Sequence, residues 1–285
     1  MSAPSTEVET IIEPTRGFRF TPWRDLYAYR DLLWLMVWRD IVARYKQTIL
    51  GPLWFIVQPL LTTFVFTLVF DRMAGIPTGG VPSTLFYLCG LLPWSYFAQT
   101  FQSTSSSLVQ NAGLFGKVYF PRLIVPLSAV LSNVVAFFIQ LGSFAAFFTL
   151  YKFTNDAATF GLSPTAALLP LVLLQVAALS LGVGLWLAAI TVRFRDFAVL
   201  ATFLIQLWMY ATPIIYPLAR VPARFQLVAA LNPMTMPVEA FRHMLLHTPA
   251  PDPRYYAFSI ATTLLALLTG LAAFQRAEKN FVDVL

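Results

Sequence analysis

The residues best suited to catalysis or metal binding stand close together near position 240. Glu239, His243 and His247 are spaced four residues apart, so on a helix they would share one face and could hold a metal ion. The same spacing is also typical of the polar face of a helix that lies on a surface. We favour this second interpretation and predict that the chain binds no metal.

The sequence contains no phosphate-binding loop for ATP hydrolysis. The run from Gly113 to Lys117 reads GLFGK, which has neither the spacing of a phosphate-binding loop nor a Ser or Thr after the lysine. No hydrophobic run holds a pair of carboxylates, and no Cys/His set has zinc spacing. We therefore expect that this chain alone cannot hydrolyse ATP and that it lacks the buried relay of a proton-driven carrier.

Uncharged polar and aromatic side chains recur at helical spacing inside three apolar runs. They are Phe55, Gln58, Thr62 and Phe66 in one run, Ser95, Gln99, Gln102, Ser103, Ser106 and Gln110 in a second, and Thr202, Gln206 and Tyr210 in a third. Amides that face lipid are costly, so these stripes should face protein or a wet path. Amide, hydroxyl and aromatic groups without charge would suit a neutral sugar chain. Hydrogen bonding between helices explains the serine-rich stripe equally well.

The composition places these stripes in a membrane. Of 285 residues, 58% are hydrophobic and 11% are charged, against about 25% charged in soluble proteins. The net charge of +6 could suggest nucleic acid as a partner, but the charges gather beside the apolar runs, so no nucleic acid is expected. Cys89 is the sole cysteine, which rules out a disulfide within the chain.

The charge-free windows predict an all-α polytopic membrane protein. A helix needs about 20 apolar residues to cross a bilayer. Six windows are long enough, at about residues 52–70, 84–109, 124–151, 166–192, 198–216 and 255–274. They belong to a transmembrane domain, 49–285. A polar tail, 1–22, and an amphipathic helix, 23–48, precede this domain.

The amphipathic helix carries an apolar stripe and a basic end. Leu33, Val37, Ile41 and Tyr45 repeat every four residues, and Trp34 and Trp38 lie beside them. The basic residues near its end are Arg39, Arg44 and Lys46. Arg30 and Arg44 interrupt the stripe, and both are expected to extend their charges toward water. Because a transmembrane run follows at once, we predict a helix in the inner membrane interface, in contact with lipids. An ordinary half-buried helix is the alternative.

The distribution of basic residues orients the chain. With six spans both termini lie on one side, and thirteen of the nineteen Lys and Arg residues fall on that side. The positive-inside rule therefore places both termini in the cytoplasm. The outer connection before the last span holds two apolar pieces, Phe225–Leu231 and Met236–Leu246, separated by Asn232-Pro233. Each is too short to cross, so residues 222–247 are predicted to form a re-entrant helix pair.

A short segment, 111–122, lies on the predicted cytoplasmic side between the second and third spans. Its apolar residues fall on one face of a short helix, which Pro121 would end: Leu114, Phe115, Val118 and Tyr119. Lys117 and Arg122 lie at the rim of this face. The aromatic face needs a partner, and a cleft on a separate ATPase is favoured over lipid headgroups because this chain has no energy source.

Four motifs together resemble one family, the permease subunits of polysaccharide ABC exporters, which are type 2 ABC transporter permeases that export O-antigen, capsule or teichoic acid. The motifs are RDIVARYKQTILGPLW, NAGLFGKVYFPR, RFRDF, and TPIIYP with LNPMTMPVEAFRHML, and the likeness spans about residues 24–275.

The resemblance implies a bacterial inner-membrane homodimer paired with two copies of an ATP-binding subunit that carries the ATP and Mg. It implies transport of an undecaprenyl-linked polysaccharide along a channel bordered by the first and fifth spans. By the same likeness, residues 111–122 are the coupling helix that docks on the ATPase.

Two other functions stay open at this stage. A proton-coupled small-solute carrier is disfavoured because the spans lack carboxylates. A membrane-embedded lipid-sugar transferase would need acidic residues at the interface, and only Asp71, Asp156, Glu239 and Asp252 lie on the predicted outer side.

Overall fold

The computed structural model describes residues 23–46, 48–115, 119–154, 160–194 and 196–280, and within these ranges every regular element is a helix. The elements are α1 (Trp23–Ala28), α2 (Arg30–Tyr45), η1 (Gly51–Leu53), α3 (Trp54–Phe66), η2 (Thr67–Met73), α4 (Ser83–Ser105), α5 (Ser107–Gln110), α6 (Ala112–Phe115), α7 (Ile124–Thr154), η3 (Pro164–Leu168), α8 (Leu169–Arg193), α9 (Phe197–Ala211), η4 (Leu218–Arg220), α10 (Ala223–Leu231), α11 (Thr235–Leu246) and α12 (Pro253–Asn280).

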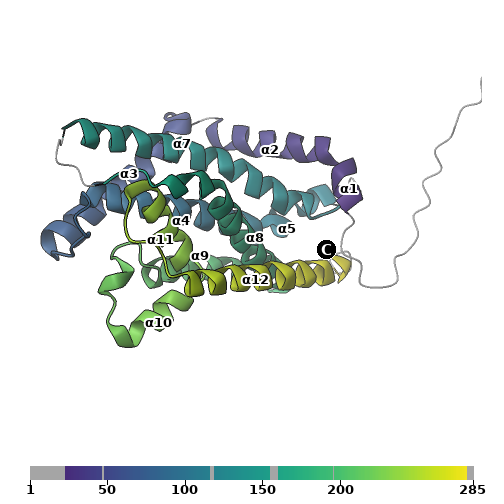
Figure 1. Cartoon of the computed structure of the whole chain (residues 1–285). Helices are drawn as coiled ribbons and strands as arrows, with labels where there is room; N and C mark the ends of the chain where they lie inside the picture. Colours follow the sequence, from purple (N-terminus) through teal and green to yellow (C-terminus); the bar gives the residue numbers. More distant parts are fainter. Residues whose placement is uncertain (1–22, 47, 116–118, 155–159, 195, 281–285) are drawn as a thin grey trace, which may run out of the picture.

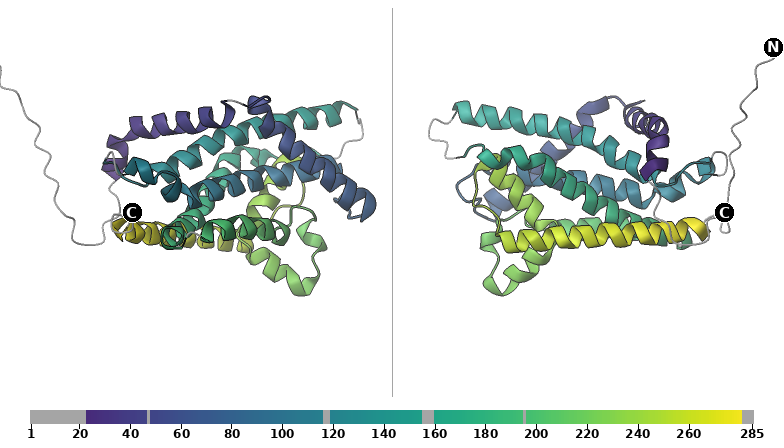
Figure 2. Two further views of the ribbon diagram at one scale, coloured as in Figure 1. Left: turned by 180° about the vertical axis from the view of Figure 1, so that it is seen from behind. Right: turned by 45° about the vertical axis from the view of Figure 1, so that its right-hand side comes forward.

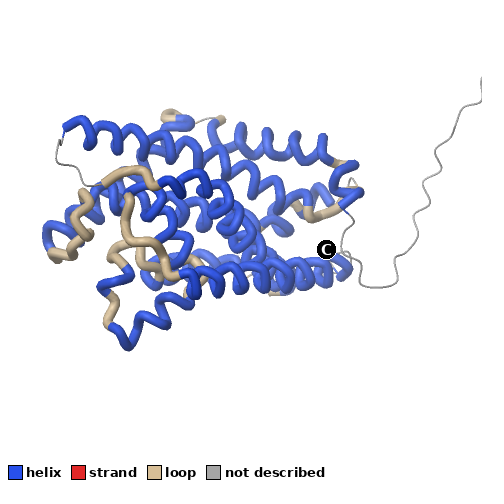
Figure 3. Tube along the Cα trace, in the orientation of Figure 1, coloured by secondary structure: helices blue, strands red, loops and turns tan. Residues whose placement is uncertain are grey.

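The long helices lie side by side in an elongated bundle (Figure 1). At one end, the α1 end, α1 lies near the last turns of α12; at the other, the α11 end, lie α10 and α11 (Figures 1 and 2). Irregular backbone gathers mainly at the two ends and leaves the middle of the bundle helical (Figure 3). This arrangement agrees with helices that satisfy their own backbone groups across an apolar layer.

The central element of the bundle is α4. It packs against α3, α7, α8, α9 and α11, and most of its residues from Leu85 to Phe101 are buried. On another side, α8 and α12 approach so closely that a Cβ on Gly182 would lie 2.6 Å from the backbone of Ala266. Small residues at such a crossing are typical of helix contacts in membranes.

Four helical stretches in the described part of the chain are long and apolar enough to cross a membrane. They are Gly51–Met73, Ile124–Thr154, Pro164–Arg193 and Pro253–Glu278, at the predicted first, third, fourth and sixth spans. The predicted second span corresponds to α4, which is long enough but carries many Ser, Thr and Gln side chains that lower its hydropathy. The chain is therefore a multi-pass membrane protein. The described residues hold four such stretches without α4 and α9, and six if both are counted.

The predicted fifth span ends earlier than expected. We predicted 198–216, but α9 stops at Ala211, and Thr212 next to it is extended. Because proline disfavours helical backbone in the residue before it, Pro213 accounts for this end. Fifteen residues of α-helix are roughly 22 Å long, less than the ~30 Å hydrocarbon layer.

The predicted helix pair exists as α10 and α11, and Asn232 fixes the turn between them. The Asn232 side chain accepts from the Trp208 indole at 2.8 Å and donates to the Thr212 hydroxyl at 2.9 Å, so the turn is tied to the end of α9. The interpretation of the second helix as surface-lying was wrong. Met236, Val238 and Phe241 are fully buried, because α11 packs against α4 and α8.

Candidate functional site

Three of the predicted path residues meet in one pocket. Gln58 and Thr62 of α3 and Gln99 of α4 line a pocket of about 190 Å³. The remaining lining residues are Pro59, Leu91, Trp94, Ser95, Ala98, Gln140 and Met209. Every side chain in this set is uncharged, so the pocket offers amide, hydroxyl and aromatic groups without a fixed charge. Its volume is below the ~300–1,000 Å³ of a small-molecule site, which favours part of a longer wall over a closed site.

The third predicted stripe lies on α9, next to α4. The Gln102 amide donates to the Thr202 hydroxyl at 3.3 Å and so joins the two helices. Thr202, Gln206 and Tyr210 are exposed on α9, and Phe55 is half-buried on α3. The polar stripe of α9 is therefore joined to that of α4 through Gln102 and Thr202, while Met209 is the α9 residue that lines the pocket.

Phe66 does not belong to this wall, which corrects the sequence interpretation. Its side chain is 7% exposed and packs edge-on against Tyr87, with ring centroids 5.9 Å apart. The reason is helical phase: Pro59, Thr63 and Phe66 are the buried residues of α3, and their spacing of four and three marks its core face. Phe66 holds α3 to α4.

The helix α2 has one buried and one exposed face, but Trp34 and Trp38 lie on the exposed face and not beside the buried stripe as predicted. Met36 and Val37 are buried where α2 packs along α7. Trp34 and Trp38 are 66% and 67% exposed on the other side. Tryptophan is enriched at the headgroup level of membranes, so this outward face suits an interfacial helix. Arg39 and Lys46 are also exposed.

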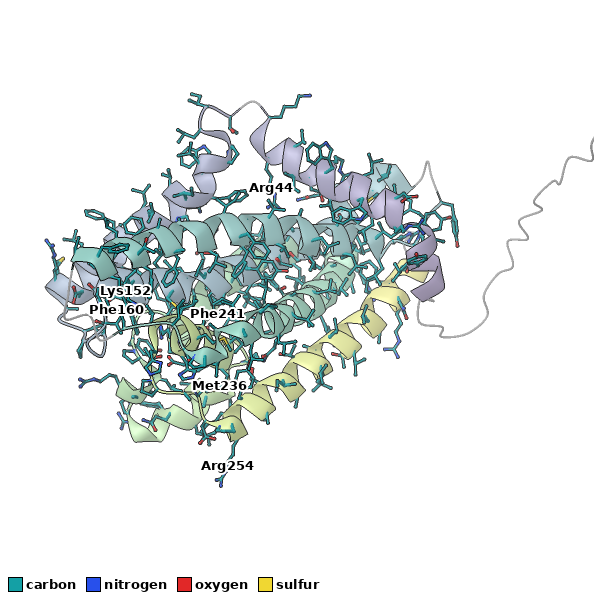
Figure 4. The ribbon with its side chains drawn as sticks, turned by 45° about the horizontal axis from the view of Figure 1, so that its top comes forward. Arg44, Lys152, Phe160, Met236, Phe241 and Arg254 are labelled. Carbon is teal, nitrogen blue, oxygen red and sulfur yellow. The ribbon has the colours of Figure 1, made fainter. Side chains whose placement is uncertain are left out.

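Arg44 behaves differently from the prediction. It was expected to extend its charge to water, but the side chain turns inward and donates to Asn133 of α7 at 2.5 Å and to Ser103 of α4 at 3.5 Å (Figure 4). Asn133 is fully buried and in turn donates to Thr100. An arginine held within a helix bundle is a candidate functional residue by default. In the sequence, the amide of Asn133 within this uncharged run could have indicated a hydrogen-bond partner for Arg44.

The segment 111–122 is helical only at its start among its described residues. The helix α6 ends at Phe115, and Lys117 and Val118 lie outside the described residues. Leu114 and Phe115 pack against the core formed by Met36, Phe120, Ile124 and Val125, so they face their own chain. Tyr119 is 81% exposed and is the described aromatic residue here that could contact a partner.

Arg122 is not at an exposed rim. Its guanidinium donates to the backbone oxygen of Glu278 at 2.6 Å and lies 4.0 Å from the side-chain carboxylate of the same residue. It also lies over the ring of Phe115, 5.6 Å from the centroid. Arg122 therefore joins the segment 111–122 to α12, because residues 156 positions apart in the sequence meet at the α1 end.

A buried arginine dominates the α11 end. Arg242 is 1% exposed, pairs with Glu239 at 2.8 Å, and donates to the backbone oxygens of Pro213 and Ile214, each at 2.6 Å. Its guanidinium also covers Phe86 of α4, 3.7 Å from the ring centroid. Burial lowers the pKa of Arg242, and the Glu239 carboxylate opposes this shift. The pair binds α11 to the segment that follows α9.

These contacts account for the histidine and glutamate motif without a metal. Glu239 is engaged by Arg242, and Nδ1 of His243 lies 2.6 Å from the backbone oxygen of Thr248. Among the described residues, no three His, Cys, Asp or Glu side chains form a group that could hold a metal ion.

Comparison with known proteins agrees with the sequence motifs. The model of the ABC-2 type transporter family matches residues 31–246. The chain is 30% identical to the O-antigen export system permease protein RfbA of Myxococcus xanthus, over 91% of this chain and 97% of that one. It is 26% identical to the protein of the same name from Klebsiella pneumoniae, over 90% and 95%. It is 22% identical to the capsule polysaccharide export inner-membrane protein CtrC of Neisseria meningitidis serogroup B, also over 90% and 95%.

Proposed function

Because the chain belongs to the ABC-2 type transporter family, we propose that it is the membrane subunit of an ATP-driven exporter that moves a lipid-linked polysaccharide across the bacterial inner membrane. The relatives' names supply the substrate class, and undecaprenol is the lipid carrier that we propose. The chain itself performs no catalysis in this scheme.

The uncharged pocket between α3, α4 and α9 is the observation that carries the proposal. A path for a neutral glycan must exchange many weak hydrogen bonds without holding the polymer at one position. Gln58, Thr62 and Gln99 offer such bonds, and Trp94 offers an aromatic surface, with no charge to retain a sugar. The same lining argues against a proton-coupled carrier, which needs ionisable groups along its route.

A second copy of the chain would complete the channel. On α3 the large apolar side chains of Leu61, Phe64 and Val65 are exposed, and on α9 so are those of Phe203 and Leu207. A homodimer would place these faces together around the polar wall, which one chain leaves open on one side. Lipid would cover whatever part of these faces the second copy leaves free.

Energy would come from two copies of a separate ATP-binding subunit, which would also carry the Mg. The docking surface would be the α1 end, where Tyr119 is exposed. In the orientation that we propose, both termini and this end are cytoplasmic. In it α4 and α9 count as the second and fifth of six spans, and α10 with α11 forms a re-entrant pair from the outer face.

The experiment combines two readouts on one pair of variants. Gln58→Leu with Gln99→Leu should lower glycan export while the co-purified ATP-binding subunit stays at the wild-type level, because both changes lie in the path and away from the α1 end. The matched control is Gln226→Leu on the exposed helix α10. Normal export by the double variant would refute the path, and failure of any ATP-binding subunit to co-purify would refute the exporter.

A further inference from the structure

A second polar cavity lies toward the α1 end, where α2 packs along the first turns of α7 and beside the last residues of α4. Its volume is about 340 Å³. It is lined by Arg39, Asp40, Ala43, Arg44, Ser103, Ser107, Gln110, Asn111, Val125 and Ala129. Unlike the uncharged pocket, this cavity contains two guanidinium groups and one carboxylate, so its lining carries a net positive charge.

The carboxylate is held by its own partners. Asp40 accepts from Arg39 at 2.8 Å and from the Ser128 hydroxyl at 3.1 Å. Arg39 additionally donates to the Asn111 side chain at 3.3 Å, and Arg44 donates to Asn133 at 2.5 Å. Both guanidinium groups therefore bind amide oxygens, of which that of Asn111 belongs to a residue that lines the cavity. Phosphate oxygens are stronger acceptors than amides, and a guanidinium can contact two of them at once.

The cavity is placed where a lipid headgroup would reach it. Trp34 and Trp38 lie on the outward face of α2, so the cavity beneath this helix would lie at headgroup depth. Its serines, Ser103 and Ser107, also continue the polar side of α4 that carries Ser95 and Gln99 in the uncharged pocket. An anionic group bound here would stand at the start of the proposed glycan path.

We propose that the cavity of Arg39 and Arg44 binds the diphosphate headgroup of the lipid carrier and so sets the substrate's starting position. This inference rests on the proposed function, which it deepens by assigning the headgroup to a site. The volume suits a diphosphate group and leaves the sugar chain to the uncharged wall. Each of the two guanidinium groups can contact one phosphate, so together they favour a diphosphate over the single phosphate of a bulk phospholipid.

The test measures lipid binding to the full permease, with its ATP-binding subunit, in nanodiscs. The ligands are undecaprenyl diphosphate and phosphatidylglycerol, each titrated and observed by native mass spectrometry. The wild type should bind the diphosphate at least about tenfold more tightly than phosphatidylglycerol. Arg44→Gln should lose about tenfold, the effect of one charged hydrogen bond.

Two further variants separate a site effect from a folding defect. Gln110→Glu adds a carboxylate to the cavity from an exposed position, so it should weaken diphosphate binding while the melting temperature is unchanged. Arg30→Gln is the matched control, because Arg30 is an exposed arginine of the same helix that pairs with Asp31 away from the cavity. It should bind like the wild type.

Each contrary result has a distinct meaning. Equal affinity for phosphatidylglycerol would overturn the assignment to the carrier lipid. Unchanged diphosphate binding in both Arg44→Gln and Gln110→Glu would overturn the site itself. In either case co-purification of the ATP-binding subunit and glycan export would still support the exporter, so a failure of this inference is distinguishable from a failure of the proposed function.

Discussion

The buried ion pair at the α11 end offers a sharp test of how this fold is held together. Replacing Arg242 with Met removes the cation and keeps a side chain of similar length. Glu239 then loses its 2.8 Å partner, and the backbone oxygens of Pro213 and Ile214 each lose a donor at 2.6 Å. Because the site is buried, water cannot easily replace these hydrogen bonds.

The expected loss is large for a single substitution. Breaking a buried ion pair by removing one partner costs about 3–5 kcal/mol. The hydrogen bonds point to a loss at least as large, since bonds to charged groups contribute about 1.5–3 kcal/mol each and Arg242 makes three, one of them to Glu239 itself. We therefore expect Arg242→Met to lower the free energy of unfolding by at least 3 kcal/mol, as an order of magnitude.

The assay is reversible unfolding in mixed detergent micelles, with Arg254→Met as the control. Arg254 is an exposed arginine at the start of α12, directed away from the bundle (Figure 4), so its loss should change stability by less than about 0.5 kcal/mol. The double change of Arg242→Met with Glu239→Gln should cost less than Arg242→Met alone, because no charge is then left buried and unpaired.

Gly90 supplies a second and stricter test. A Cβ at Gly90 would lie 2.9 Å from Nη2 of Arg242, so the guanidinium fits only beside glycine. Gly90→Ala should destabilise the wild type by about 1–3 kcal/mol and the Arg242→Met background by much less. Equal costs in both backgrounds, or an Arg242→Met variant as stable as the wild type, would refute this account of the α11 end.

Three further predictions concern docking, packing and topology. Tyr119→Ala should reduce co-purification of the ATP-binding subunit several-fold without lowering the melting temperature, because its side chain is exposed; retained binding would move the docking surface elsewhere. Gly182→Ala should separate α8 from α12 and lower the melting temperature sharply, whereas Gly142→Ala, with open space around it, should be tolerated; equal effects would contradict this contact. Reporter fusions after Arg122 should be cytoplasmic and those after Pro251 external; a cytoplasmic signal after Pro251 would overturn the proposed orientation.

Much of the helical framework could be predicted from apolar periodicity, and the limits of that method are instructive. Charge-free windows located α7 and α8 to within three residues because charges or breakers flank them, but α12 continues six residues beyond its window, past Arg276 and Glu278. Windows could not locate the end of α9, where Thr212 precedes a proline. They also count residues without weighing polarity, so the window at α4 is as long as the others although its Ser, Thr and Gln side chains lower its hydropathy.

The candidate site was predictable in kind and only partly in detail. Helical spacing placed Gln58 and Thr62 on one face of α3, and the packing of α3 against α4 brings Gln99 into the same pocket, whose role as a path stays a prediction. It misplaced Phe66, since spacing alone cannot say which of two adjacent stripes faces the core. It also could not foresee the contacts of Arg44 and Arg122, whose partners come from distant helices.

The two arginines that reach into the bundle, Arg44 and Arg242, lie near opposite ends of α4, on either side of the uncharged pocket. Arg44 lies at the α1 end of α4 and Arg242 at its α11 end, while the pocket between them is lined by uncharged residues. A guanidinium in the middle would bind sugar hydroxyls or counterions strongly and slow a moving chain. At the ends the same group can hold a headgroup or fix a helix without touching the polymer in transit. In the exporter that we propose, the polarity that lowers the hydropathy of α4 and the absence of charge from the pocket would have one cause, a surface on which a glycan can slide.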